Sequence, residues 1–190
     1  PRPETAELVD WIATTNSCSE PLRVMDIGTG SGCIAIALKK HCPAWHVQGV
    51  DISAEALEVA KNNAAKNAVD IVWKQMDILS EKPDSQDIIV SNPPYITARE
   101  MTQLPGSVKD YEPHMALFGG EDGLDFYRSI AANYKSSLKP GGYLCFEFGM
   151  GQGDDVCAIL EANGYTILER TRDYNDIERA VLAQLGGKED

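Results

Sequence analysis

Apolar residues along the chain occur in two alternating patterns, short continuous runs and segments with helical spacing. The runs, rich in β-branched and aromatic residues, predict buried strands at residues 22–27, 47–51, 71–75, 87–91 and 143–148. Apolar residues that recur every three or four positions predict amphipathic helices over residues 5–15, around 34–38, after Ser53, over 124–138 and around 156–160. Strands that alternate with helices in this way are typical of a parallel sheet covered by crossover helices.

The end of the chain breaks this alternation. Residues 165–171 and 178–185 have strand-like patterns, and only residues 172–177 connect them. Such a short connection permits an antiparallel pair but not a parallel crossover. Parallel strands followed by an antiparallel hairpin predict a mostly parallel, seven-stranded sheet, the α/β, Rossmann-like layout of class I S-adenosylmethionine-dependent methyltransferases. A nicotinamide-binding Rossmann domain would be expected to continue in parallel.

One long stretch, from Asn92 to about Asp122, has neither pattern. It exceeds the roughly 12–15 residues that are usual for a structureless loop in a compact domain. Such stretches are commonly functional or carry short elements of their own. We expect a lid that faces the substrate.

A glycine-rich segment lies between the first predicted strand and the next helix. Gly28, Gly30 and Gly32, with Thr29 and Ser31 between them, let the backbone turn tightly and approach a ligand. Dinucleotide-binding loops have G-x-G-x-x-G spacing and receive a pyrophosphate at the helix N-terminus. The G-x-G-x-G spacing found in this chain resembles the loop that holds the methionine part of S-adenosylmethionine.

Acidic residues at the ends of neighbouring strands extend this predicted cofactor site. Asp51 ends the second strand, at the separation from the glycines at which a carboxylate binds ribose hydroxyls. Ile52 follows it. Asp77, after the third strand, can accept a hydrogen bond from an adenine amino group, and Ile78 can pack on the ring. Asp26 is expected near the cationic end of the cofactor, or alternatively it fixes the glycine loop.

Asn92, Pro93, Pro94 and Tyr95 directly follow the fourth predicted strand. Ligands of open parallel sheets bind beyond the carboxyl ends of the strands, so this turn should meet substrate, and Asn92 also the cofactor. The Asn92 side-chain carbonyl and the Pro93 backbone carbonyl can each accept one N–H of a planar NH₂ group. They would aim its lone pair at a methyl carbon and stabilise the positive charge that develops on nitrogen. The prolines stiffen the turn, and Tyr95 offers an aromatic face. The motif predicts methyl transfer to an amide-type nitrogen without a general base.

Charge and composition bear on the partner and the compartment. The chain has 190 residues, enough for one domain, with 17 basic and 29 acidic side chains and a net charge of −12. A protein that holds duplex DNA needs a basic face, so we expect a protein substrate and no stable nucleic-acid binding. No apolar run approaches the roughly 20 residues of a membrane span, and no secretory leader is visible. We therefore expect a cytoplasmic domain without membrane contact.

The cysteines give no sign of a metal site. Their spacing is scattered, and no CxxC pair occurs, which disfavours both a metal centre and a disulfide framework. We expect no metal, and reduced, mostly buried thiols. The five cysteines are Cys18, Cys33, Cys42, Cys145 and Cys157.

Further motifs are more particular than the glycine loop and the Asn-Pro-Pro-Tyr turn, which adenine-N(6) methyltransferases share. Pro-Arg-Pro-Glu-Thr stands at residues 1–5, Tyr-Glu-Pro at 111–113, Ala-Leu-Phe-Gly-Gly-Glu-Asp-Gly-Leu at 116–124 and Leu-Lys-Pro-Gly-Gly at 138–142. Together these stretches span nearly the whole chain, which resembles the catalytic domain of the protein-glutamine N(5)-methyltransferases that modify peptide-chain release factors. Ala6 and His114 depart from the residues common in that family, Glu and Arg respectively.

The resemblance implies a substrate, a cofactor and a further domain. The substrate would be the glutamine of the Gly-Gly-Gln loop of a release factor. The cofactor would be S-adenosyl-L-methionine, with S-adenosyl-L-homocysteine as product. Because the chain begins at Pro1, we expect residues 1–190 to be the methyltransferase domain of a longer protein with a helical N-terminal domain.

Three alternatives compete with this interpretation. A methyltransferase could act on an exocyclic amino group of adenine or guanine, although the acidity of the chain disfavours the basic channel needed. A module could hold the cofactor without catalysis, which the intact Asn-Pro-Pro-Tyr turn disfavours. A nicotinamide oxidoreductase would require the other glycine spacing. Glu112 is expected either to contact substrate or to hold the long loop, and the sequence assigns no role to His114 or Glu147.

Overall fold

The computed structural model describes residues 3–103, 117–173 and 175–186. The described residues form one seven-stranded sheet with the strand order β3-β2-β1-β4-β5-β7-β6. Glu112 and His114, and with them the central part of the predicted lid, lie outside the described residues. The strands are β1 (Arg23–Ile27), β2 (His46–Asp51), β3 (Val72–Gln75), β4 (Gln86–Ser91), β5 (Leu138–Glu147), β6 (Tyr165–Arg172) and β7 (Glu178–Leu185).

Strands β1 to β5 pair in parallel, and the C-terminal hairpin is antiparallel. This arrangement confirms the predicted fold class. Strand β7 enters the sheet between β5 and β6 and pairs antiparallel with both. The hairpin was predictable from its short connection, whereas the insertion of β7 beside β5 was not.

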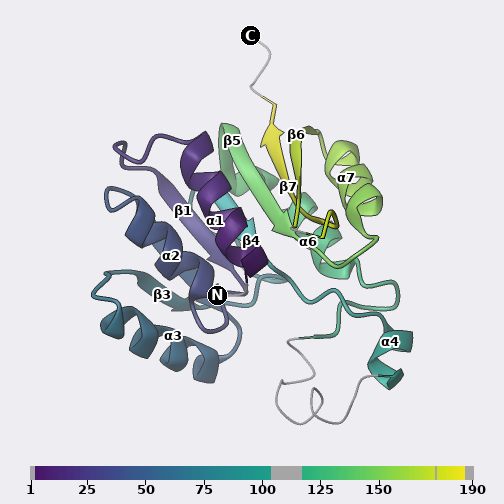
Figure 1. The fold of residues 1–190 in the computed structure, drawn as a ribbon, viewed down its shortest axis with the longest axis horizontal. Helices are drawn as coiled ribbons and strands as arrows, with labels where there is room; N and C mark the ends of the chain where they lie inside the picture. Colours follow the sequence, from purple (N-terminus) through teal and green to yellow (C-terminus); the bar gives the residue numbers. More distant parts are fainter. Residues whose placement is uncertain (1–2, 104–116, 174, 187–190) are drawn as a thin grey trace.

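Helices cover both faces of the sheet (Figure 1). On one face, α1 (Pro3–Thr15), α2 (Cys33–His41) and α3 (Ala54–Lys66) contribute to a core cluster that includes Val24. On the other face, α6 (Asp125–Asn133) and α7 (Gly153–Ala162) pack on a cluster that includes Met25. Neighbouring residues of β1 thus point to opposite faces, as the alternation of a strand requires. A short helix, α4 (Ala98–Gln103), lies within the predicted long loop.

Two helix ends have side chains or backbone conformations that favour them. The Ser53 side chain accepts a hydrogen bond from the Ala56 N–H at 3.1 Å and caps α3, which satisfies one of the unpaired donors at a helix start. At the end of α7, Gly164 follows the C-cap with a φ of 85°, a conformation that glycine adopts without a steric penalty.

The predicted helix over residues 124–138 is too long. Helix α6 ends at Asn133, a 3₁₀ turn, η2, covers Lys135–Ser137, and β5 begins at Leu138, ahead of the predicted start at Tyr143. The register of β5 against β4 shifts between Gln86 and Ile88, so residues 139–142 form an irregular start of the strand. Tyr134 and Leu138 are buried although they follow the end of α6. Their spacing from Ala131 matches that of a helix, and this explains why the predicted helix was too long.

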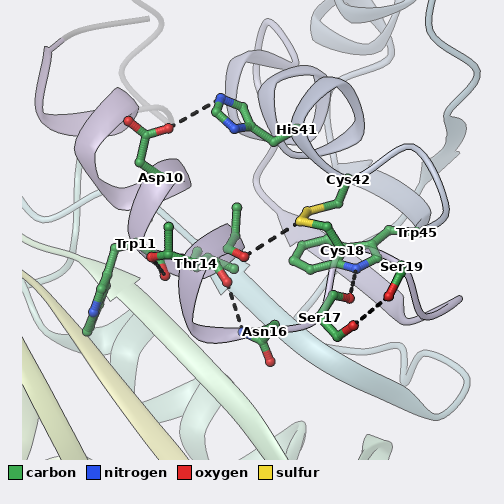
Figure 2. Close-up of a disulfide and its surroundings, with 12 residues drawn as sticks. Asp10, Trp11, Thr14, Asn16, Ser17, Cys18, Ser19, His41, Cys42 and Trp45 are labelled. Atoms are coloured by element: carbon green, nitrogen blue, oxygen red, sulfur yellow. Dashed lines mark hydrogen bonds and ion pairs between the residues drawn. A yellow bond between two sulfur atoms is a disulfide. The ribbon is translucent and has the colours of Figure 1, made fainter.

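The expectation of reduced thiols is wrong for two cysteines. The structure joins Cys18, in the loop after α1, and Cys42, at the end of α2, in a disulfide (Figure 2). Around it, Trp45 donates from Nε1 to the Ser17 carbonyl at 3.0 Å, and Asp10 and His41 approach within 3.3 Å. The packing of α1 against α2 brings these segments together, so their spacing in sequence gave no indication of the pair.

Among the described residues, no helix has both the length and the apolar character needed to cross a membrane.

Candidate functional site

The register of the sheet brings the predicted site residues to one edge. The chain runs from β1 outward through β2 to β3 and then returns to β4 on the other side of β1. In open α/β sheets, ligands bind at the carboxyl ends of the strands beside such a reversal. Ile27 pairs with Val50 of β2 and with Ser91 of β4. The next residues, Gly28, Asp51 and Asn92, therefore leave neighbouring strands at the same level.

A buried hydrogen bond fixes the two halves of this edge to each other. Ser91 donates from Oγ to the Ile27 carbonyl at 2.8 Å. The contact joins the residue before Asn92 to the residue before Gly28. Sequence reasoning missed Ser91, because a serine at a strand end carries no signal of its partner.

The glycine loop is fastened to the end of β2. The Thr29 N–H donates to the Val50 carbonyl at 3.0 Å, and the Gly30 N–H donates to Asp51 Oδ2 at 2.9 Å. Asp51 Oδ1 accepts from the Ser53 N–H, also at 2.9 Å. Because each carboxylate oxygen has two lone pairs, the half-buried Asp51 retains acceptor capacity for a ligand.

Ser31 and Ile52 lie on the exposed side of this region. Ser31 is exposed, and its hydroxyl lies 3.2 Å from the Cys33 sulfur. The Ile52 side chain is 49% exposed. Gly32, which ends the loop, is buried and precedes the first residue of α2.

Asp26 lies beneath the loop and is 1% exposed. Its Oδ2 accepts hydrogen bonds from the Thr29 hydroxyl at 2.6 Å and from the Ala35 N–H at 3.2 Å. Its Oδ1 is buried and has no hydrogen-bond partner among the described residues. Burial raises the pKa of Asp26 to about 7 even though these hydrogen bonds lower it. An orphaned, buried carboxylate oxygen at this position suits a cationic ligand nearby, because a positive charge favours the ionised form.

Asp77 and Ile78 follow β3 at the same edge of the sheet. The Asp77 carboxylate accepts from the Leu79 N–H at 2.9 Å and from the Ser80 hydroxyl at 3.0 Å. Ile78 is partly buried against the core on the α6 side, and its carbonyl accepts from the Tyr134 hydroxyl at 3.2 Å. Asp77 is thus held in a local turn in which both of its oxygens already have a partner.

The Asn92 side chain reaches from β4 to the end of β5. Its Nδ2 donates to Glu147 Oε1 at 2.9 Å, and Glu147 Oε2 accepts from the Thr5 hydroxyl at 3.2 Å. Asn92 is half-buried, whereas Glu147 is 8% exposed. The sequence assigned no role to Glu147, and only the pairing of β4 with β5 brings it beside Asn92.

The backbone after Pro93, itself buried, is enclosed on two sides. On one side, a Cβ on Gly119 would lie 2.6 Å from the Pro94 carbonyl oxygen, so only glycine allows this approach. On the other side, Gln152 donates from Nε2 to the Tyr95 carbonyl at 3.2 Å and accepts from the Gly149 N–H at 2.9 Å. Sequence reasoning missed Gln152, since its partners are distant in sequence.

The two ends of the predicted lid are paired with each other. The Ile96 N–H donates to the Leu117 carbonyl at 3.0 Å, and the Gly119 N–H donates to the Ile96 carbonyl at 2.9 Å. The Gly-Gly-Glu-Asp-Gly-Leu segment therefore packs directly behind the Asn-Pro-Pro-Tyr turn. These two motifs, separate in sequence, form one structural unit.

The assembled edge has hydrogen-bond acceptors in place, among them the carboxylates of Asp26, Asp51, Asp77 and Glu147. In the described part of the chain, no three His, Cys, Asp or Glu side chains are grouped so that they could hold a metal ion. The arrangement suits the alignment of an uncharged NH₂ group beside a cofactor held by β1 and β2.

Comparison with known proteins identifies the family. Residues 5–105 match the model of the Methyltransferase small domain. The chain is 43% identical to the release factor glutamine methyltransferase of Bacteroides thetaiotaomicron, over 96% of this chain and 66% of that protein. It is 42% identical to the protein of the same name from Clostridium acetobutylicum, over 98% of this chain and 67% of that one. The chain thus spans about two thirds of the length of these curated relatives.

Solved structures share the fold at low sequence identity. Magnesium protoporphyrin IX methyltransferase from Synechocystis, with bound S-adenosylmethionine, aligns with a TM-score of 0.65 at 18% identity, over 96% of this chain and 78% of that one. The N-methyltransferase NodS from Bradyrhizobium japonicum, in complex with S-adenosylhomocysteine, aligns with a TM-score of 0.66 at 19% identity, over 97% and 86%. With the class I fold and the relatives above, the chain belongs to the S-adenosylmethionine-dependent release factor glutamine methyltransferases.

Proposed function

We propose that this chain is the methyltransferase domain that transfers a methyl group from S-adenosylmethionine to the side-chain amide nitrogen of a glutamine in a peptide-chain release factor. The observation that carries the proposal is the position of Asn92. It leaves β4 beside the glycine loop, and its amide nitrogen is already bound by Glu147 Oε1 at 2.9 Å. The side-chain oxygen is then the group left to receive an N–H of the substrate.

Residues of β1, β2 and β3 would hold the cofactor. The loop from Gly28 to Gly32 would enclose its methionine part, and Asp51 would accept hydrogen bonds from ribose hydroxyls. The buried negative charge of Asp26 would stabilise the cationic end of the cofactor electrostatically, without a direct hydrogen bond. Asp77 and Ile78 would contact the adenine, and Ile52 would line the ribose side.

The chain's contribution to the reaction is alignment. S-adenosylmethionine, held by the residues above, would supply an electrophilic methyl carbon. The amide nitrogen would form the new N–C bond as the S–C bond breaks with its electron pair left on sulfur, and a proton would pass from the nitrogen to water. Asn92 Oδ1 and the Pro93 carbonyl would each accept one N–H, which turns the amide lone pair toward the methyl carbon. The same oxygens stabilise the positive charge that develops on nitrogen. Tyr95 would pack on the substrate plane.

A transfer assay with three acceptors tests the proposal. Labelled S-adenosylmethionine is offered with a release factor, with the same factor carrying alanine in place of its loop glutamine, and with bulk nucleic acid. We expect label on the intact factor alone. Label on the alanine variant would place the methyl group elsewhere on the protein, and label only on nucleic acid would assign the chain to the amino groups of bases.

The charge of the chain favours the protein acceptor over nucleic acid. With a net charge of −12, the domain repels a phosphate backbone at long range. A release factor bound to this domain in the cytoplasm fits both the acidity of the chain and the names of its relatives.

A further inference from the structure

The orientation of the Asn92 amide decides what this residue offers a substrate. An asparagine side chain has an oxygen that accepts and a nitrogen that donates. A half-turn about the Cβ–Cγ bond exchanges the positions of these two atoms. Only the oxygen can receive the N–H of an amide substrate. A neighbour that distinguishes the two ends is therefore needed.

Glu147 is that neighbour. An ionised carboxylate only accepts hydrogen bonds, so Glu147 Oε1 can bind only the nitrogen end of the Asn92 amide, at 2.9 Å. The other carboxylate oxygen accepts from Thr5 Oγ1 at 3.2 Å. Glu147 is 8% exposed, and burial strengthens such a contact because little water competes for it.

The backbone of Glu147 is fixed as firmly as its side chain. Its carbonyl accepts from the buried Tyr127 hydroxyl at 3.1 Å. The residue ends β5 between β4 and β7, paired with Ala180, and the next N–H, of Phe148, donates to the Arg179 carbonyl at 2.9 Å. The carboxylate is thus carried by a central strand rather than by a loop.

We propose that Glu147 is a positioning residue for Asn92, and that Thr5 of α1 holds the Glu147 carboxylate in place. The inference rests on the proposed function, in which Asn92 binds the side-chain amide of the glutamine that receives the methyl group. It also accounts for the threonine of the Pro-Arg-Pro-Glu-Thr motif, which reaches the acceptor site from the first turn of α1 through one shared carboxylate.

Two substitutions separate orientation from charge. Glu147→Gln retains an oxygen that can accept from Asn92, whereas Glu147→Leu removes every acceptor. We expect Glu147→Leu to lower kcat on the order of 10- to 100-fold, the loss typical of an outer partner that orients a reacting group. Glu147→Gln should recover most of that loss. The KM for the release factor and the Kd for S-adenosylhomocysteine should stay close to their wild-type values, because all other contacts of the two ligands are retained.

A double-mutant cycle distinguishes positioning from general structural damage. In the Asn92→Ala background, Glu147→Leu should have no further effect on kcat, because the group that it orients is gone. Equal losses in both backgrounds would overturn the proposal. The matched control is Glu169→Gln, which weakens another carboxylate contact to α1, the 2.6 Å hydrogen bond from Trp11 Nε1. This control should keep wild-type kcat.

A readout without turnover keeps this inference separate from the proposed function. In the full chain labelled with ¹⁵N, the Asn92 side-chain amide proton that faces Glu147 should exchange slowly with solvent in the wild type. In Glu147→Leu it should exchange fast. An unchanged exchange rate in Glu147→Leu would overturn the positioning role, even if glutamine is methylated. A wild-type protein that methylates no release factor would overturn the proposed function. In that case the exchange rate would still test whether Glu147 orients the Asn92 amide.

Discussion

The glycine loop and the Asn-Pro-Pro-Tyr turn lie side by side but are held in different ways. The loop is held by residues close in sequence: Asp26 binds a hydroxyl three positions away, and Asp51 binds a backbone N–H 21 positions away. The turn is held by Glu147 and Gln152, which are 55 and 57 positions from their partners. The cofactor half is thus a local structure, whereas the acceptor half exists only once β5 has paired with β4.

The two regions also differ in electrostatics. Beneath the loop, the buried Asp26 has one oxygen without a hydrogen-bond partner in the described part of the chain and a pKa raised to about 7. At the turn, Glu147 is bound by both Asn92 and Thr5. An unsatisfied carboxylate leaves room for a cation that arrives later, and a satisfied carboxylate keeps a catalytic group in one orientation. Under the proposed function, the loop would therefore be prepared for binding, and the turn for alignment.

The largest effect should come from the turn. Asn92→Ala should lower kcat by about 10²- to 10³-fold, the usual loss when one group that stabilises developing charge is removed. The Kd for S-adenosylhomocysteine, measured by calorimetry, should change little. Near-normal turnover would show that Asn92 has no role in the mechanism. A loss of cofactor affinity as large as the loss of kcat would show that the two regions do not have separate roles.

The next effect should come from the loop, with the opposite kinetic signature. Asp51→Ala should weaken cofactor binding roughly 10- to 100-fold, because a hydrogen bond to a charged group contributes about 1.5–3 kcal/mol. At saturating cofactor, kcat should recover. Asp70→Ala, at an exposed aspartate just before β3, is the control and should leave the Kd unchanged.

A smaller, pH-dependent effect should come from Asp26. Its pKa is raised from 3.8 to about 7 in the folded chain, so the folded state binds more protons than the unfolded state between these values. The free energy of unfolding should therefore fall as pH rises through this window, by at most about 1.4 kcal/mol per pH unit, and level off above it. Asp26→Asn should lack this component, so its stability relative to the wild type should increase from pH 4 to pH 7.

Urea unfolding of both proteins across this pH range measures the effect. The gain in stability of Asp26→Asn relative to the wild type should be accompanied by weaker binding of the cationic cofactor to this variant at pH 8, where wild-type Asp26 is ionised. Parallel stability curves for the two proteins would show that Asp26 does not titrate in this window.

The smallest effect should come from the ring of Tyr95. A Cβ on Gly149 would lie 2.7 Å from Tyr95 Cδ2, so Gly149→Ala should displace the ring. We expect the KM for the release factor to rise about fivefold, equivalent to about 1 kcal/mol, with cofactor affinity unchanged. Gly186→Ala is the control, because a Cβ there would have its nearest neighbour at 4.0 Å. A change in cofactor Kd would show that the displacement spreads to the loop.

The order of residues along the chain was enough to predict the seven strands and most of the helices, although not the end of α6 or the start of β5. Apolar periodicity predicted the strands, and the short connection after residue 171 predicted the antiparallel hairpin. Asp51 and Asn92 could be placed at the ends of strands because strand ends and turn residues are set by local backbone preferences. The rule that ligands bind at the carboxyl ends of parallel strands then placed them at one edge before any distance was known.

The partners of these residues, in contrast, depend on how the whole chain folds. Glu147 meets Asn92 through the pairing of β5 with β4, Cys18 meets Cys42 through the packing of α1 on α2, and β7 enters beside β5. Each of these contacts joins segments whose approach depends on the register and the packing of the whole sheet. Local patterns in a sequence are short-range and carry no record of that register, and this is why the residues that hold Asn92 in place could not be read from the chain.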